Sequence, residues 1–99
     1  MQFEWDTKKA AANLKKHKID FAEAETVFGD PLAKIFDDEI HSINEKREII
    51  IGHSIKNRLL LVSFTERESD TVRIISARPP TSQERKDYEN AGYKRRNVA

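Results

Sequence analysis

The pattern of apolar and polar residues is helical near the start of the chain. After residues 3–5, which alternate like a short strand, Ala10, Leu14 and His17 recur at helical spacing. Asp6 precedes them and is a suitable N-cap, because its carboxylate can accept hydrogen bonds from the first free N–H groups of a helix. We therefore predict a first helix from Asp6 to about His17.

A second helical pattern follows directly. Asp20 and Glu23 have the spacing of a capping box, in which each side chain reaches the backbone N–H of the other residue. The apolar residues behind this start share one face of a helix, namely Phe21, Ala24, Val27 and Phe28. Gly29-Asp30-Pro31 ends the pattern, so we predict a short second helix before residue 29.

From residue 32 onward the pattern is that of β-strands. Apolar and β-branched residues gather in four segments, at residues 32–36, 47–54, 58–66 and 71–77. Short polar breaks at residues 56–57 and 68–70 join three of them, and breaks of this length connect antiparallel strands. We predict a four-stranded antiparallel meander, to which residues 3–5 can add a short N-terminal strand.

The chain closes with a third helical pattern. Pro79-Pro80 stops the last strand, and residues 81–84 form a second capping-box pattern that opens a helix to about Ala91, before Gly92. We take residues 1–92 as one domain and residues 93–99 as a basic tail. Two helices, an antiparallel sheet and a terminal helix make an α+β fold with one sheet face covered and the other partly open.

Length and composition limit the class of protein. The 99 residues, 37% hydrophobic and 35% charged, allow one modest core beneath a highly charged surface. The chain has no cysteine, which excludes disulfides and thiolate metal sites and suits a reducing cytoplasm. The N-terminus lacks the features of a signal peptide, and no apolar run approaches the ~20 residues of a membrane span. We expect a cytoplasmic, unprocessed protein without a membrane partner.

The net charge of +1 conceals an uneven distribution of charge. Between Asp6 and Ile19 there are five lysines and no acid, whereas Asp30 to Glu48 carries six acids against three bases. Such patches fit a phosphate-bearing ligand on one side and a basic partner on the other. The alternative is that both are simply solvated faces.

Several motifs occur in the order found in one known family. They are Phe3-Glu4-Trp5-Asp6, the helix from Lys9 to His17, Phe21-Ala22-Glu23-Ala24 before Val27-Phe28, Arg47 before Ile51-Gly52, Leu60-Leu61-Val62 before Thr65-Glu66-Arg67, Arg73-Ile74-Ile75-Ser76-Ala77-Arg78, and Glu84-Arg85 before Tyr88. Over residues 2–90 this order resembles the BrnT toxins of bacterial type II toxin–antitoxin operons. The chain departs from the family at Pro79-Pro80, where relatives commonly have further basic residues and an alanine. This puts in doubt any phosphate contact just after Arg78.

The resemblance implies a RelE-like fold and a ribonuclease activity that arrests translation. It also implies a protein partner, a BrnA-type antitoxin with a ribbon-helix-helix DNA-binding domain that neutralises the toxin. In such families the toxin–antitoxin complex represses its own operon, so operator DNA is expected as a partner only through that complex. No metal or other cofactor is expected. The alternative is a module of the same fold that binds antitoxin or nucleic acid without cleaving it.

Arginines are the first candidates for the chemistry. Metal-free RNA cleavage needs a base, an acid and fixed positive charge near one phosphate, and the planar guanidinium suits the last role. Arg47, Arg67 and Arg78 come from consecutive predicted strands and are the candidate catalytic arginines, although each can also be an ordinary surface or salt-bridged side chain. Strand alternation places Arg73 opposite Arg78 unless the strand bends or ends before Arg78. The candidates for RNA binding are Lys15, Lys16, Arg73 and Arg85.

His17, His53 and Tyr88 are the candidates for proton transfer, because histidine changes charge near neutral pH and tyrosine carries a phenolic proton. His17 at a helix end also suits the helix dipole, and His53 at a strand end suits a plain surface role. Tyr88 is the main apolar residue of the last helix and can instead be a packing anchor.

Two further groups receive a structural interpretation. Asp37-Asp38-Glu39 lies near His41, but neighbouring residues of an extended segment point to opposite faces, and the chain has no second cluster at ligand spacing. We interpret this segment as a solvated loop or an antitoxin contact rather than a metal site. Phe3 and Trp5 can stack on nucleic-acid bases, but with only eight aromatic residues in the chain burial is favoured.

Overall fold

A computed structural model describes residues 1–98, and the side chains of residues 1–90. Its elements are, in chain order, β1 Gln2–Trp5, α1 Thr7–His17, α2 Phe21–Thr26, the 3₁₀ turn η1 Val27–Gly29, β2 Lys34–Asp37, the 3₁₀ turn η2 Glu39–His41, β3 Glu48–His53, β4 Leu59–Arg67, β5 Thr71–Arg78 and α3 Ser82–Val98. The predicted α+β class is confirmed. Within the described residues, no helix is long and apolar enough to cross a membrane.

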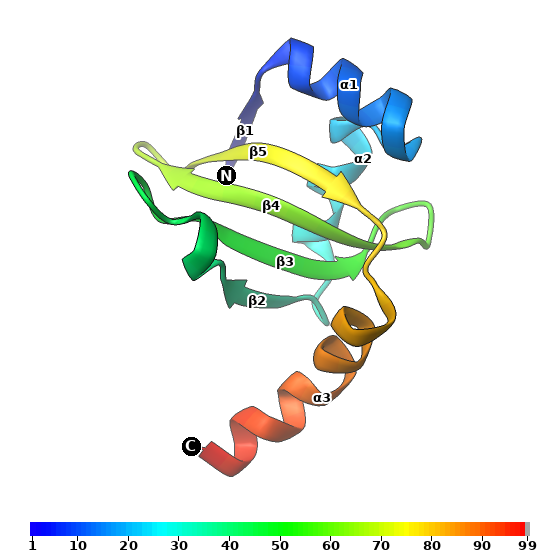
Figure 1. The fold of residues 1–99 in the computed structure, drawn as a ribbon, viewed down its shortest axis with the longest axis vertical. Helices are drawn as coiled ribbons and strands as arrows, with labels where there is room; N and C mark the ends of the chain where they lie inside the picture. Colours follow the sequence, from blue (N-terminus) through cyan, green and yellow to red (C-terminus); the bar gives the residue numbers. More distant parts are fainter. Residues whose placement is uncertain (99) are drawn as a thin grey trace.

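One mixed sheet organises the molecule, with the strand order β1-β5-β4-β3-β2 (Figure 1). Strands β2 to β5 form the predicted antiparallel meander, and β1 pairs with β5 in parallel. The short N-terminal strand therefore completes a five-stranded sheet. Its aromatic residues hold it in place, because the Phe3 ring lies 5.2 Å from Phe28 and the Trp5 ring 5.9 Å from Phe21.

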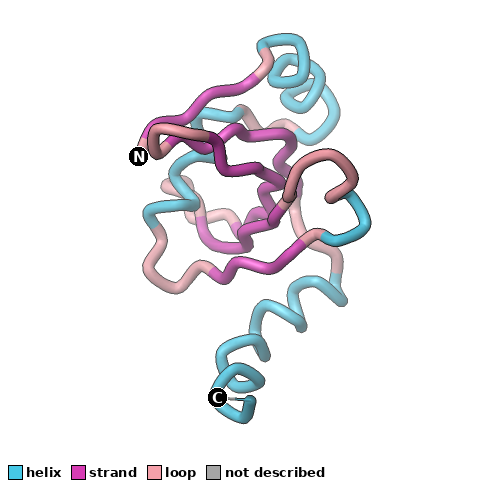
Figure 2. Tube along the Cα trace, turned by 90° about the vertical axis from the view of Figure 1, so that its left-hand side faces the viewer, coloured by secondary structure: helices cyan, strands magenta, loops and turns pink. Residues whose placement is uncertain are grey.

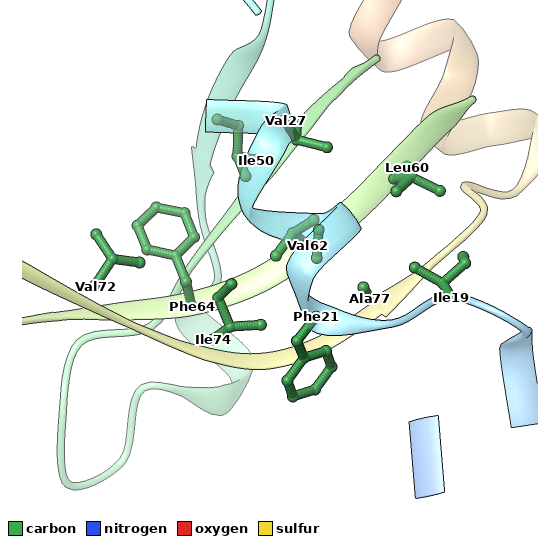
Figure 3. Close-up of a cluster of buried hydrophobic side chains, with 11 residues drawn as sticks. Ile19, Phe21, Val27, Ile50, Leu60, Val62, Phe64, Val72, Ile74 and Ala77 are labelled. Carbon is green, nitrogen blue, oxygen red and sulfur yellow. The ribbon is translucent and has the colours of Figure 1, made fainter. Parts of the chain in front are cut away.

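The helices α1 and α2 pack on β5 and the turn η1 packs on β3, so all three cover the same face of the sheet (Figure 1). The side chains between these layers form the hydrophobic core, and Figure 3 shows Phe21 and Val27 clustered with the strand residues Val62, Phe64 and Ile74. On the opposite face, α3 leaves the end of β5 and passes beside β2, away from the body of the sheet (Figures 1 and 2). Much of that second face is open, as the sequence predicts.

The first helix begins and ends where predicted, but it presents a different face to the core. The Asp6 carboxylate accepts hydrogen bonds from the N–H groups of Lys8 and Lys9, and Lys18 adopts the left-handed conformation just after His17. Leu14, predicted to be on the apolar face, is 47% exposed. The buried residue is Asn13, whose amide pairs with the backbone of strand β5 and of residue 19. The buried backbone groups of Ile19 and Ala77 need hydrogen-bond partners, and the Asn13 amide supplies them.

The second helix is shorter than predicted, because α2 ends at Thr26 and tightens into η1. Only one half of the predicted capping box forms, with the Glu23 N–H donating to the Asp20 carboxylate at 2.7 Å. The Glu23 side chain turns instead to the end of the sheet, where it accepts hydrogen bonds from Arg58 and from the hydroxyl of Ser54. Glu23 thus forms a long-range ion pair with Arg58 in place of the second hydrogen bond of the capping box.

The last helix starts with the complete capping box that its sequence predicts. The Glu84 N–H donates to the Thr81 hydroxyl at 3.2 Å, and the Thr81 N–H donates to the Glu84 carboxylate at 2.8 Å. The predicted end at Ala91 is wrong, because α3 continues through Gly92 to Val98. An internal glycine costs a helix only about 1 kcal/mol, so it need not end one. The strand bounds differ from prediction by one or two residues at their ends.

A β-bulge in β5 changes which side chains share a surface. The pairing of β4 with β5 is regular from Arg67 to Phe64 and then shifts, so that Ser63 pairs with Ser76 and Ile75 is the extra residue. Val72, Ile74 and Ala77 consequently all face the helices. Strict alternation, which predicts that Arg73 and Arg78 lie on opposite faces, fails at this bulge, because the extra residue brings both arginines to the open face.

Candidate active site

The open face of the sheet carries a hollow of about 420 Å³, which we call the arginine pocket. Strands β3, β4 and β5 form its floor, and the loop after β2 and the start of α3 form its walls. Its lining residues are Asp38, Ile40, His41, Arg47, Ile49, Leu61, Ser63, Ile75, Ser76, Arg78 and Glu84. Two of the predicted catalytic residues, Arg47 and Arg78, therefore converge here, one from just before β3 and the other from the end of β5.

Arg78 lies at the end of β5, where the bulge turns its side chain toward the pocket. Its guanidinium forms two parallel hydrogen bonds with Glu84, from Nη1 to Oε1 at 2.7 Å and from Nη2 to Oε2 at 2.8 Å. The hydrogen bonds from Arg78 lower the pKa of Glu84 from 4.5 to about 2, and Glu84 raises the pKa of Arg78 in return. The pair fixes the guanidinium plane at the pocket wall and partly balances its charge.

Arg47 immediately precedes β3 and contributes the second guanidinium. Its Nε atom is buried and has no hydrogen-bond partner among the described residues. The closest carboxylate, that of Glu45, lies 3.9 Å from Nε, which is an ion pair without a hydrogen bond. A buried donor without an acceptor is costly. The Arg47 side chain as a whole is 32% exposed and lines the pocket, so other N–H groups of its guanidinium can meet an anion there.

His41, which is not among the predicted catalytic residues, also lines the arginine pocket. Nδ1 of His41 lies 2.9 and 3.0 Å from the two carboxylate oxygens of Asp38. The two residues face each other because η2 is a 3₁₀ turn, which places side chains three positions apart on the same side. The spacing Asp-x-x-His on a tight turn is the signal that could identify them. The sequence interpretation of the segment as a solvated loop or an antitoxin contact does not anticipate this turn.

The acidic segment does not form a metal site within the described residues. Among them, no three histidine, aspartate or glutamate side chains come close enough together to hold a metal ion. Asp37 turns away from His41 and pairs with Lys46 at 3.7 Å. Of the ionisable residues of this segment, only Asp38 and His41 line the arginine pocket.

Arg67 lies in a different hollow, of about 830 Å³, at the other end of the open face. This hollow is lined by five acidic residues and only two basic ones, so it is poorly suited to an RNA phosphate: Glu4, Glu45, Lys46, Glu48, Thr65, Glu66, Arg67, Glu68 and Thr71. Arg73 lies nearby and donates to the Glu4 carboxylate at 2.8 Å. The structure thus separates Arg67 and Arg73 from the arginine pocket.

His53 and Tyr88 come together, but outside the arginine pocket. Their ring centroids are 6.5 Å apart, and Nδ1 of His53 lies 3.7 Å from the Asp30 carboxylate. The backbone N–H of His53 donates to that carboxylate at 2.7 Å, which is the largest cause of the lowered pKa of Asp30. Burial raises the pKa of Tyr88. These contacts fit the interpretation of Tyr88 as a packing anchor, here for α3.

The remaining candidates also lie outside the arginine pocket. His17 is half-buried in the last turn of α1, and Lys15 and Lys16 are exposed beside it. Arg85 is exposed on the first turn of α3, next to Glu84 but not lining the hollow. Of the ten side chains that the sequence suggested for the site, only Arg47 and Arg78 line the arginine pocket.

Fold and pocket together define a class, namely small α+β proteins that offer an arginine-lined hollow on the open face of a sheet whose other face is covered by helices. The chain belongs to the BrnT family, since the family model described as "Ribonuclease toxin, BrnT, of type II toxin-antitoxin system" matches residues 5–84. The resemblance found in the sequence is thereby confirmed. The match ends at Glu84, so most of α3 lies beyond it.

The fold has a counterpart among solved structures. The crystal structure of the Brucella abortus ribonuclease toxin BrnT is similar to this chain with a TM-score of 0.63 and 27% sequence identity. The similarity covers 83% of this chain and 99% of that one, so nearly all of the Brucella protein has an equivalent here. No curated protein sequence matches the chain.

Proposed function

We propose that the chain is the toxin of a type II toxin–antitoxin system and acts as a metal-independent endoribonuclease that inhibits translation in the cytoplasm. The observation that carries the proposal is the convergence of Arg47 and Arg78 on one pocket of the open sheet face. Membership of a family of ribonuclease toxins supports it.

The chemistry of the pocket suits phosphodiester cleavage. As the phosphorus passes through a five-coordinate transition state, negative charge grows on its non-bridging oxygens, and fixed cations aimed at them lower the barrier. Arg78 is held in a defined orientation by Glu84, and the partly exposed guanidinium of Arg47 lines the same pocket and can donate hydrogen bonds to an anion there. The hydroxyls of Ser63 and Ser76 on the pocket floor can donate further hydrogen bonds.

The RNA on either side of the cleaved bond needs contacts outside the pocket. We assign Arg85, exposed one residue after Glu84, to one flanking phosphate, and Lys15, Lys16 and Arg73 to more distant ones. His17, His53, Arg67 and Tyr88 do not line the pocket, so the proposal gives them no part in bond cleavage.

The partner that restrains the toxin is, in this proposal, a BrnA-type antitoxin with a ribbon-helix-helix domain. The family description supports an antitoxin partner in general. Operator DNA would then be bound only through the complex, because the DNA-binding domain belongs to the antitoxin.

The test compares growth and RNA cleavage for the wild type and for Arg47→Ala, Arg78→Ala and Arg67→Ala. Wild type expressed without antitoxin should arrest growth, and the purified protein should cleave RNA in the presence of EDTA. Removing either pocket arginine should lower the cleavage rate by about 10²- to 10³-fold. Arg67→Ala should cost much less, because Arg67 lies in the acidic hollow.

Lys86→Ala is the matched control, since it removes an exposed cation from α3 without touching the pocket. If purified wild type leaves RNA intact, the enzyme hypothesis fails. Binding of antitoxin or RNA without cleavage would then support the alternative of a non-catalytic module.

A further inference from the structure

The His41–Asp38 pair has the geometry of a proton-transfer group, and it lines the same pocket as the two arginines. We infer that His41 is the general base that removes the proton from the attacking 2′-hydroxyl of RNA, and that Asp38 is the residue that positions it. This inference rests on the proposed ribonuclease function and names the base that the sequence left open.

The hydrogen bonds around His41 determine which ring nitrogen can act. A carboxylate only accepts hydrogen bonds, so Nδ1, at 2.9 Å from Asp38, must carry the proton. Nε2 of the neutral ring then has a lone pair, and it has no hydrogen-bond partner among the described residues. An imidazole with one nitrogen held by a carboxylate and the other free is the arrangement that general-base catalysis requires.

The exposure of the two residues suits these roles. The His41 side chain is 62% exposed, so RNA can reach it from solvent, whereas the Asp38 side chain is only 18% exposed. Hydrogen bonds hold the Asp38 backbone in place. The Asp38 N–H donates to the carbonyl of Arg47, and its own carbonyl accepts from Ser42. The backbone of Asp38 is thus fixed to the start of β3, the strand that Arg47 precedes.

Charged groups of both signs surround His41. Asp38 contacts it directly, Arg47, Arg78 and Glu84 line the same pocket, and Glu45 lines an adjoining hollow of about 340 Å³ together with His41 and Arg47. The surroundings of His41 thus contain two cations and three carboxylates. The imidazolium formed during the reaction would be stabilised by Asp38.

His41 is better placed than the other two histidines. His53 and His17 both lie outside the arginine pocket. RNA whose phosphate is bound by Arg47 and Arg78 would therefore present the neighbouring ribose 2′-hydroxyl to neither histidine. His41 is the pocket-lining histidine of the described chain. Proximity to the bound phosphate therefore favours His41 as the base.

The reaction balances without a cofactor. Nε2 of His41 takes the 2′-hydroxyl proton while the 2′-oxygen forms a bond to phosphorus and the bond from phosphorus to the 5′-oxygen breaks. The leaving 5′-oxygen takes a proton from water, and the imidazolium later returns its proton to solvent. The products are a 2′,3′-cyclic phosphate and a 5′-hydroxyl.

The test uses the full chain and four variants, namely His41→Gln, His41→Gly, Asp38→Asn and the control Glu39→Gln. Glu39 is exposed on the same 3₁₀ turn but does not line the pocket. Single-turnover cleavage of a transcribed RNA gives the rate, and binding of a 2′-O-methyl RNA that cannot react gives the affinity. The end groups of the fragments identify the products.

We expect His41→Gln to lower the cleavage rate by about 10²- to 10⁴-fold while 2′-O-methyl RNA binding changes less than about threefold. The rise of rate with pH near neutrality should disappear, and added imidazole should restore part of the activity of His41→Gly. Asp38→Asn should lower the rate about tenfold or more, because the ring loses its fixed orientation. A purely structural role for His41 would produce neither the altered pH profile nor the rescue.

The outcomes separate this inference from the proposed function. If wild type cleaves RNA and His41→Gln cleaves it at a similar rate, His41 is not the base, while the ribonuclease proposal stands. If the fragments carry 3′-hydroxyl and 5′-phosphate ends, the 2′-hydroxyl is not the nucleophile and the inference is again wrong. If wild type cleaves no RNA at all, both proposals fall together.

Discussion

The ion pair between Arg78 and Glu84 should make the stability of the fold depend on pH in a predictable way. Glu84→Gln removes the charge and keeps the shape. Glutamine can still serve as the second residue of the capping box with Thr81, so the start of α3 should be preserved. The substitution therefore isolates the electrostatic part of the contact.

The magnitude follows from the pKa of Glu84, which is lowered from 4.5 to about 2, mainly by Arg78. Because one pKa unit corresponds to about 1.4 kcal/mol, the full effect would be about 3 kcal/mol. The Arg78 and Glu84 side chains are 35% and 28% exposed, so solvent screening reduces the expected value to about 1 to 2 kcal/mol.

The direction follows from linkage. A carboxylate whose pKa is lower in the folded state stabilises the fold above the unfolded-state pKa and loses this contribution as the pH falls. Wild type should thus be more stable than Glu84→Gln by about 1 to 2 kcal/mol at pH 7. The difference should shrink as the pH falls from about 4.5 toward 2.

Urea denaturation followed by circular dichroism at several pH values measures this difference. Glu89→Gln is the control, since Glu89 is exposed on the same helix and forms no ion pair with any described residue. Two results would contradict the reasoning. One is a difference that stays constant between pH 7 and pH 3, and the other is a Glu89→Gln variant that behaves like Glu84→Gln.

Three further substitutions test the packing that positions the pocket. Asn13→Ala should cost about 2 to 3 kcal/mol, seen as a fall of about 10 °C in the Tm, because three buried backbone groups lose their partner; an unchanged Tm would contradict this role. Arg58→Ala should lower the midpoint of urea denaturation at pH 7, since it leaves the buried Glu23 carboxylate without its cation. The loss should be smaller below pH 4.5, because Arg58 is the main cause of the lowered pKa of Glu23, and an equal loss at both pH values would refute this account. Gly52→Ala should cost about 1 to 3 kcal/mol, because the new Cβ at residue 52 would lie 2.7 Å from the Cβ of Ala33. A variant with wild-type stability would show that the backbone shifts there to make room.

The sequence predicted most of the fold because the relevant signals are local. Asp6, Asp20 and Thr81 each accept a hydrogen bond from a nearby N–H, and these caps depend only on residues two or three positions away. The strands likewise follow from runs of apolar residues whose alternation is independent of what they pair with. The predictions that were wrong, such as the placement of the exposed Leu14 on the apolar face of its helix, concern side chains whose environment depends on a distant segment.

The candidate site was only partly predictable for the same reason. Arg47 and Arg78 were chosen because arginine suits a phosphate, and both line the pocket. Arg67, also on a neighbouring strand, lies instead among carboxylates at the other end of the sheet. His41 was missed because its partnership with Asp38 requires a 3₁₀ turn that composition does not reveal.

The sequence by itself determined the order and type of the elements, the caps that begin the helices, and the family to which the chain belongs. Only the tertiary structure decided that β1 pairs with β5 in parallel and that a bulge at Ile75 turns Arg78 to the open face beside Arg47 and His41. The physical reason is the separation along the chain over which each interaction acts. Caps and strand propensities act over a few residues, whereas register and side-chain convergence are fixed by the packing of segments far apart in the chain.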